Sequence, residues 1–141
     1  MNDIQMITPR IIHLPKIEDK RGNLSFFEAE SHIPFSIKRV YWIYDVPGGQ
    51  ARGGHAFLSQ QEFIVALSGS FEVVFNDGDV KRSFMLNRSY YGLYIPALVW
   101  REMKNFSTNA FALVVSSTRF SEGDYIRHYP DYLKHIKHEN K

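Results

Sequence analysis

The chain has 141 residues, a formal net charge of +2 and no cysteine. Its length fits one domain, so we expect residues 1–141 to form a single domain. Without cysteine, disulfides, thiolate metal ligands and a cysteine nucleophile are excluded, and the near-neutral charge gives no case for nucleic-acid binding. The charged N-terminal segment and the lack of a long apolar run predict neither a signal peptide nor a membrane span, and we expect a cytoplasmic protein.

Short runs of β-branched and aromatic residues alternate with turn residues along the chain, which predicts strands. The predicted strands are residues 4–12, 24–28, 37–44, 62–67, 71–75, 80–86, 90–95, 99–103 and 110–116. Turn residues at 19–23, 47–49, 68–70 and 76–79 separate them. Only residues 125–136 have a helical pattern, with Pro130 suited to a first turn. We therefore expect an all-β double-sheet jelly roll closed on itself, with a short C-terminal helix.

The segment GQARGGHAFLSQQEFIVALSG, residues 49–69, has an unusual spacing of glycines, histidine and glutamate. It resembles the first cupin motif, in which glycine is followed by His-x-His, then glutamate, then glycine. His55 and Glu62 occupy two of these positions, and Phe57 replaces the second histidine. A later segment, PALVWREMKN, has the spacing of the second cupin motif, with Arg101 where that motif has histidine.

The spacing predicts that these residues share a cavity. Residues 55 and 57 are two apart on a strand and point to the same face, and Glu62 and Arg101 arrive from other strands. Phenylalanine has no metal-binding atom, and arginine donates hydrogen bonds but has no lone pair to give. We therefore predict a site without a metal or other cofactor, positive and aromatic in character.

Several blocks, in order, resemble the dTDP-4-keto-6-deoxyglucose 3,4-ketoisomerase family of the cupin superfamily. They are IPFSIKRVYWIYDVPGGQARGGHA, ALSGSFEVVFNDG, GLYIPALVWREMKNFS and EGDYIRHYPDYL. The resemblance implies an RmlC-like cupin fold, also called a double-stranded β-helix. It also implies a metal-free homodimer that exchanges an N-terminal strand. The implied reaction turns a dTDP-linked 4-keto sugar into its 3-keto isomer, on the way to deoxyamino sugars of surface polysaccharides.

Such a reaction removes a proton from C3, passes through an enediolate and returns a proton at C4. Histidine suits this base role, so His55 is the leading candidate. Arg52 and Arg101 are candidates for stabilising the oxyanion. Arg21 and Arg39 are predicted to bind the diphosphate, together with Arg52. Tyr41 is predicted to line a slot that holds the nucleobase. Glu62 is a further predicted substrate-binding residue.

Other interpretations remain open on the sequence alone. Arg101 and Glu62 also fit a purely structural buried salt bridge, and Glu62 fits an exposed strand position. Because Phe57 replaces the second motif histidine, a catalytically silent cupin that binds a dTDP-sugar is the main alternative to an isomerase. A 3,5-epimerase-like enzyme is a third hypothesis, but no His–Asp pair with a tyrosine acid is visible.

Overall fold

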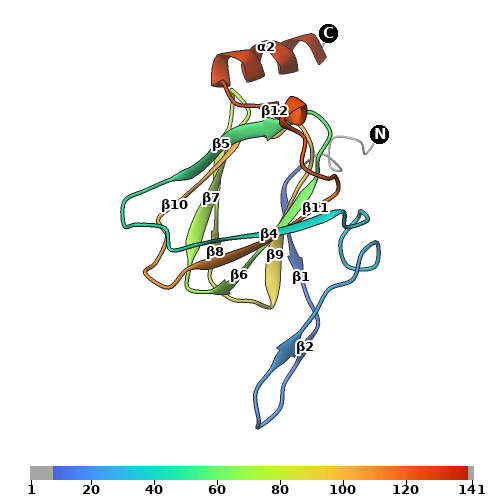
Figure 1. The fold of residues 1–141 in the computed structure, drawn as a ribbon, viewed down its shortest axis with the longest axis vertical. Coiled ribbons are helices and arrows are strands. Elements are labelled where there is room, and N and C mark those ends of the chain that lie inside the picture. Colours follow the sequence, from blue (N-terminus) through green and yellow to red (C-terminus); the bar gives the residue numbers. More distant parts are fainter. Residues whose placement is uncertain (1–7, 140–141) are drawn as a thin grey trace.

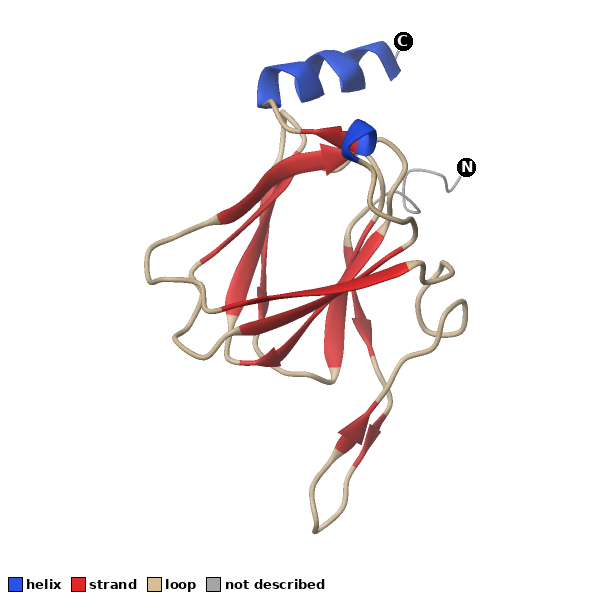
Figure 2. Ribbon diagram, viewed as in Figure 1, coloured by secondary structure: helices blue, strands red, loops and turns tan. Residues whose placement is uncertain are grey.

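The computed structural model describes residues 8–139, and its strands form two five-stranded sheets (Figures 1 and 2). The first sheet has the order β1 (Arg10–His13), β9 (Tyr91–Ile95), β6 (Glu62–Ser68), β11 (Phe111–Ser116) and β4 (Arg39–Tyr44). The second has the order β12 (Tyr125–Ile126), β5 (Arg52–Phe57), β10 (Arg101–Lys104), β7 (Phe71–Asn76) and β8 (Lys81–Leu86).

All ladders within the two sheets are antiparallel, and the all-β cupin-like expectation is confirmed. The expected closure is wrong, because hydrogen bonding leaves two separate sheets. Their facing surfaces enclose an apolar core to which β6, β7, β9 and β11 contribute. Of the predicted strand at residues 4–12, residues 4–7 lie outside the described part, and β1 begins at Arg10.

Strand β4 shows how the sequence separates the two faces of the first sheet. Arg39, Tyr41 and Ile43 alternate with more exposed residues, and all three line the space between the sheets. Val40, Trp42 and Tyr44 point the other way and are exposed. This alternation follows from the two-residue period of a strand, and it places charged and aromatic side chains of one edge strand inside the molecule.

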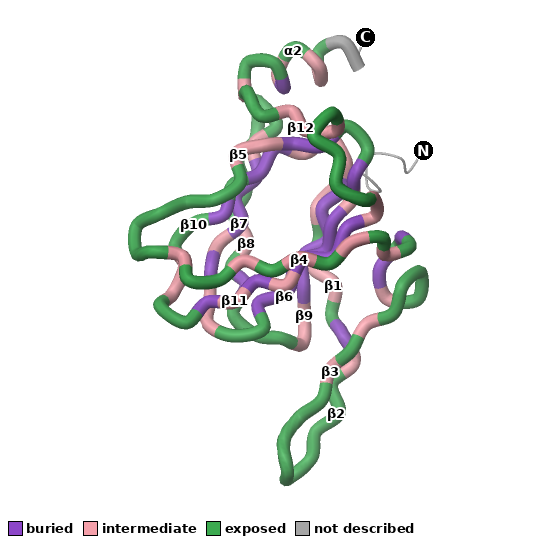
Figure 3. Tube along the Cα trace, viewed as in Figure 1, coloured by how far each residue is buried: buried purple, intermediate pink, exposed green. Residues whose placement is uncertain are grey.

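Residues 14–37 leave the first sheet and return to it. Leu14, Ile33 and Phe35 pack on its outer face against Phe63 and Val65 of β6. Between them, β2 (Lys16–Ile17) and β3 (Leu24–Ser25) form a hairpin that projects from the body (Figures 1 and 3). The hairpin is exposed along most of its length, so few packing contacts with the rest of the chain stabilise it.

The C-terminal helix α2 (Tyr129–Glu139) lies over the end of the second sheet at β5 and β12 (Figure 2). It is anchored by Tyr132, which is buried against Trp100 and Ala56 and donates a 3.0 Å hydrogen bond to the carbonyl of Leu98. The predicted helix is confirmed, but its start is wrong. Residues 125 and 126 form β12 beside β5, and a short 3-10 turn (Glu122–Asp124) precedes them.

None of the helices in the described range is both long enough and apolar enough to cross a membrane.

Candidate active site

A cavity of about 350 Å³ lies between the two sheets, above the apolar core. Strands β4 and β6 of the first sheet form one wall, and β5, β10 and β12 of the second form the other. The lining residues are Arg39, Tyr41, Ile43, Arg52, Gly53, His55, Glu62, Ile64, Arg101, Met103, Phe120, Tyr125 and Arg127. The cavity therefore combines four arginines with one imidazole, one carboxylate and three aromatic rings.

A bulge between β5 and β10 aims two of these residues into the cavity. His55 pairs with Arg101, but Gly53 pairs with Glu102, so one extra residue is accommodated on β5. Gly53 and Gly54 both have positive φ values, 98° and 69°. A Cβ at Gly53 would lie 3.2 Å from the carbonyl oxygen of Arg101, closer than most Cβ contacts, so a side chain there would press on the backbone of the partner strand and would also be strained by the positive φ. The glycine pair thus brings His55 directly opposite Arg101.

Arg101 connects the residues at the floor of the cavity. It is 3 % exposed, and its guanidinium forms an ion pair with Glu62 through Nη2 and Oε1. Its Nε donates a 3.1 Å hydrogen bond to Nε2 of His55. Its Cζ lies 4.7 Å from the ring centroid of Phe57. The salt bridge with Glu62 considered from the sequence is thus present, and it lines the cavity at the same time.

Glu62 is fully buried and serves as an acceptor for its neighbours. Its Oε2 accepts hydrogen bonds from Tyr41 at 2.7 Å, Gln60 at 2.7 Å and Ser116 at 3.2 Å, and Arg101 donates to its other oxygen. An exposed strand position is therefore excluded for Glu62. With both oxygens engaged, Glu62 fixes the position of Arg101. Its contact with substrate stays a prediction.

His55 is held as a neutral imidazole. Burial lowers its pKa to about 3, and the positive charge of Arg101 acts in the same direction. Because Nε2 accepts the hydrogen bond from Arg101, the single proton of the neutral ring sits on Nδ1. A neutral imidazole can accept a proton, provided that substrate takes the place of Arg101 Nε at this nitrogen.

The donor set of this site does not suit the metal found in many cupins. It offers one imidazole nitrogen that already accepts a hydrogen bond and one carboxylate that is paired with a guanidinium. The guanidinium would also repel a cation. Within residues 8–139, no group of three or more histidine, aspartate or glutamate side chains is arranged to hold a metal ion.

Phe57 lies behind the cavity. It is 2 % exposed, and its ring contacts His55 edge-on at 4.9 Å between centroids and Tyr125 at 4.6 Å. The Arg101 guanidinium also lies over the Phe57 ring, so Phe57 packs against both His55 and Arg101 and helps to hold them in position. A second imidazole is absent from this position, so the cavity has one histidine.

Positive charge surrounds the rest of the cavity. Arg39 lies over the rings of Tyr41 and Phe120, at 5.1 and 5.4 Å from their centroids. Its Nε is buried and finds no hydrogen-bond partner in the part of the chain that the structure describes. Arg52 and Arg127 are exposed and line the same cavity. A buried guanidinium nitrogen without a partner is typical of a site that receives an anion.

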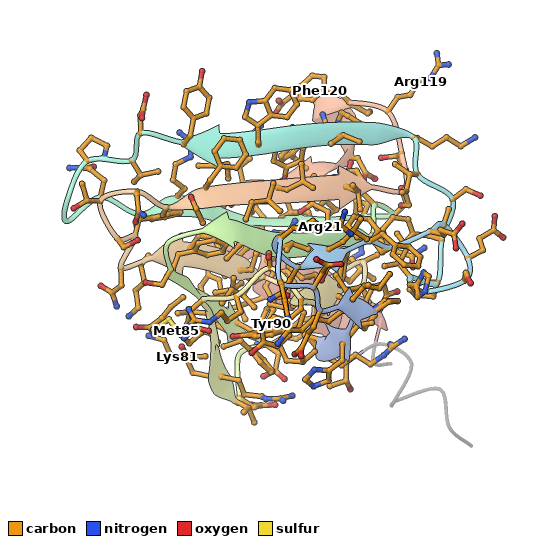
Figure 4. All side chains as sticks on the ribbon, turned by 90° about the horizontal axis from the view of Figure 1, so that it is seen from below. Arg21, Lys81, Met85, Tyr90, Arg119 and Phe120 are labelled. Atoms are coloured by element: carbon orange, nitrogen blue, oxygen red, sulfur yellow. The ribbon has the colours of Figure 1, made fainter. Side chains whose placement is uncertain are left out.

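Arg21 is not brought to this cavity. It lies at the tip of the β2–β3 hairpin, its side chain is 90 % exposed, and it pairs with Asp19 at 2.9 Å. Figure 4 labels Arg21 apart from Phe120, which lines the cavity. Within one chain, the predicted contact of Arg21 with substrate therefore has no geometric support.

The sequence analysis missed three of the charged and aromatic residues that line the cavity: Phe120, Tyr125 and Arg127. Tyr125 was included in the predicted helix, whereas pairing of β12 with β5 places it across from Phe57. The DYIR block of the family resemblance contains Tyr125 and Arg127 and was the one signal that pointed to them. Tyr41 lines the cavity, and its hydroxyl donates a hydrogen bond to Glu62 at the floor. The expected contact of Tyr41 with the nucleobase stays a prediction.

Comparison with known proteins decides the family. Residues 7–137 match the family model described as FdtA, WxcM-like, C-terminal. The chain belongs to this family of sugar 3,4-ketoisomerases. It is 40% identical over 127 residues to the TDP-4-oxo-6-deoxy-alpha-D-glucose-3,4-oxoisomerase of Aneurinibacillus thermoaerophilus, covering 90% of this chain and 91% of the relative.

Solved structures of 3,4-ketoisomerases have closely the same fold as this chain. One from Helicobacter canadensis superposes with a TM-score of 0.90 at 39% identity, covering 93% of this chain and 98% of the other. A histidine-to-asparagine variant of the enzyme from Thermoanaerobacterium thermosaccharolyticum, in complex with TDP-4-keto-6-deoxyglucose, gives 0.90 at 36% identity, covering 92% and 94%. Family membership makes this chain an isomerase, and a catalytically silent cupin is not favoured.

Proposed function

We propose that this isomerase converts dTDP-4-keto-6-deoxyglucose to its 3-keto isomer by base-mediated enolisation. The observation that carries the proposal is the neutral imidazole of His55, held beside the Arg101 guanidinium in a cavity that contains both. The names of the relatives support the choice of substrate, since they act on or bind the TDP-linked 4-keto sugar. No cofactor is required, because C3 is oxidised to a ketone while C4 of the same molecule is reduced to an alcohol, so no electrons enter or leave the sugar.

The reaction balances within the sugar. His55 takes the hydrogen of C3, a C3=C4 double bond forms, and the electron pair of the C4 carbonyl moves to O4. Arg101 donates to the oxyanion that develops there, and Arg52 supplies further positive charge from the rim of the cavity. The negative charge of the enediolate favours the protonated imidazole, which then returns its proton to C4. The proton of O3 is transferred to O4, so that C3 becomes the ketone and C4 carries the hydroxyl.

Turnover of the proposed substrate is tested directly by proton NMR. The purified protein is incubated with dTDP-4-keto-6-deoxyglucose in ordinary water, and the resonances of the 4-keto and 3-keto sugars are followed. We expect the 3-keto isomer to accumulate to equilibrium. A protein that binds the sugar nucleotide but leaves it unchanged would contradict the proposal.

The diphosphate is proposed to bind at Arg39 and Arg52. Replacing Arg39 by glutamine should weaken binding of thymidine diphosphate by about 10- to 100-fold, the usual worth of one charge-assisted hydrogen bond. Isothermal titration calorimetry measures the change. Arg88→Gln is the matched control, because Arg88 is exposed and bonds only to the carbonyl of its neighbour Asn87 among the interactions described. Equal affinities of the two variants would place the diphosphate elsewhere.

We also propose that two copies of the chain form a homodimer. Trp42 on the outer face of β4 is 54% exposed, and its neighbours Val40 and Tyr44 are 47% and 57% exposed. The projecting β2–β3 hairpin exposes further apolar side chains, at Ile17 and Leu24. Exposed apolar side chains gathered on one strand face are typical of an interface. The prediction that Arg21 binds substrate requires that the hairpin of one copy reach the cavity of the other.

Light scattering after gel filtration tests the dimer. We expect a mass of about twice the 16.5 kDa of one chain. Trp42→Glu should shift the protein to a monomer, because it buries a charge in the proposed interface. Met85→Glu is the control, since Met85 is similarly exposed, at 48%, but lies on β8 of the second sheet. A mass of one chain at all concentrations would contradict the proposal.

A cytoplasmic location and a place in deoxyamino-sugar and surface polysaccharide biosynthesis remain predictions that rest on the family resemblance.

A further inference from the structure

The proposed isomerisation has to move two different protons, and His55 accounts for one of them. The hydrogen on carbon passes from C3 to C4. A second proton, on oxygen, has to leave the C3 hydroxyl and appear on O4. Because the base is engaged with the carbon-bound hydrogen, a second proton-carrying side chain is needed beside it.

Arginine stays protonated throughout, so among the described residues the cavity lining offers four side chains that can exchange a proton: Tyr41, His55, Glu62 and Tyr125. Glu62 accepts hydrogen bonds at both oxygens and is paired with Arg101. Tyr41 donates its proton to Glu62 at 2.7 Å, and burial, with the adjacent Glu62 charge, raises its pKa far above the usual value. A hydroxyl so held keeps its proton, and this leaves Tyr125.

Tyr125 is well placed for the role. It is the cross-strand partner of Phe57 in the β12–β5 ladder, so its ring stands beside the position where the cupin motif usually has its second histidine. Its ring centroid lies 5.2 Å from that of His55 and 4.6 Å from that of Phe57. The guanidinium of Arg127 lies over the Tyr125 ring, 3.9 Å from its centroid, and holds the ring in place by a cation–π contact.

We propose that Tyr125 is a second catalytic residue of this enzyme, which takes the proton from the C3 hydroxyl and delivers it to O4. The phenol gives its proton to O4 and receives the proton of O3, so it ends each turnover as it began. No oxidant, reductant or co-reactant is involved. This role rests on the proposed isomerisation.

The test separates the two protons. In deuterated water, abstraction of the C3 hydrogen by His55 followed by its return exchanges that hydrogen for deuterium without any movement of the oxygen proton. Tyr125→Phe deletes one oxygen atom and keeps the ring that packs on His55 and Phe57. We expect this variant to exchange the C3 hydrogen at close to the wild-type rate, and to form the 3-keto sugar about 100-fold more slowly or worse.

Tyr129→Phe is the matched control, because its hydroxyl bonds to Asn76 and it is not among the residues that line the cavity. It should exchange and isomerise as the wild type does. Arg127→Gln is a second variant that leaves the phenol in place, and the ratio of isomerisation to exchange should fall there too. Thermal unfolding confirms that each variant is folded.

Two results would overturn the role of Tyr125. One is a ratio of isomerisation to exchange that stays at the wild-type value in both variants. The other is a folded Tyr125→Phe protein that loses exchange together with isomerisation, since Tyr125 would then act on binding or on the carbon-bound proton. Failure of the proposed function itself is recognised separately, because the wild-type protein would then neither exchange nor isomerise the 4-keto sugar.

Discussion

Replacing Arg101 by methionine is expected to destabilise the fold by about 3–5 kcal/mol and to abolish turnover, because it leaves the charge of Glu62 buried without its partner. Arg101 and Glu62 are 3% and 1% exposed, so water does not replace the lost ion pair. The same change removes the donor to the developing oxyanion and the hydrogen bond to His55. Urea unfolding measures the stability, and the NMR assay measures turnover.

A double variant, Arg101→Met with Glu62→Gln, separates the structural role of the pair from the catalytic one. It leaves no charge buried and keeps an amide oxygen to accept from Tyr41. We expect it to recover a large part of the stability, because replacing both partners of a buried pair is often nearly neutral, and to remain inactive. A single Arg101→Met variant as stable as the wild type would show that the ion pair does not hold the cavity floor together.

His55→Asn should lower the rate of isomerisation by about 10²- to 10⁴-fold, which is the usual contribution of a positioned base. Asparagine is similar in size and keeps polar atoms but has no basic nitrogen. Initial rates at saturating substrate check this, and an unchanged melting temperature at neutral pH shows that the fold is kept. A variant that retains wild-type rates would exclude His55 as the base.

The lowered pKa of His55 also predicts how stability depends on pH. The pKa of His55 in the folded state is about 3, below the ordinary histidine value of 6.5. As pH falls from about 6.5 towards 3, the unfolded chain binds a proton at His55 and the folded chain does not, so the free energy of unfolding falls. Thermal unfolding at pH 7 and pH 5 should show a loss that is smaller in His55→Asn. An equal loss in both proteins would contradict the buried neutral imidazole.

The fold could be predicted from the sequence because its signals are local. The alternation of β4 and the apolar run of β6 follow from the two-residue period and from burial on both faces. Motif spacing also predicted that His55, Phe57, Glu62 and Arg101 would share a cavity. Three of them line one cavity, but for Phe57 the prediction is wrong, because its ring packs behind the cavity against His55 and Arg101.

The parts that were missed depend on contacts between distant segments. Tyr125 enters the site because a two-residue strand pairs with β5, and so short a strand has no period to detect. The predicted closure of the barrel was wrong for a related reason. Whether the edges of two sheets are hydrogen-bonded to each other cannot be recognised from the residues of any one strand. The role of Glu62 depends on hydrogen bonds from residues far along the chain, including Ser116.

The central claim is that one histidine, His55, serves as the base although Phe57 stands where the motif usually has a second. It is tested most directly by proton NMR of the wild-type protein with dTDP-4-keto-6-deoxyglucose in deuterated water, beside His55→Asn. We predict deuterium at C3 and a 3-keto product with the wild type, and neither with the variant. Exchange that persists in His55→Asn, or a wild-type protein that binds the sugar without exchange, would contradict the account.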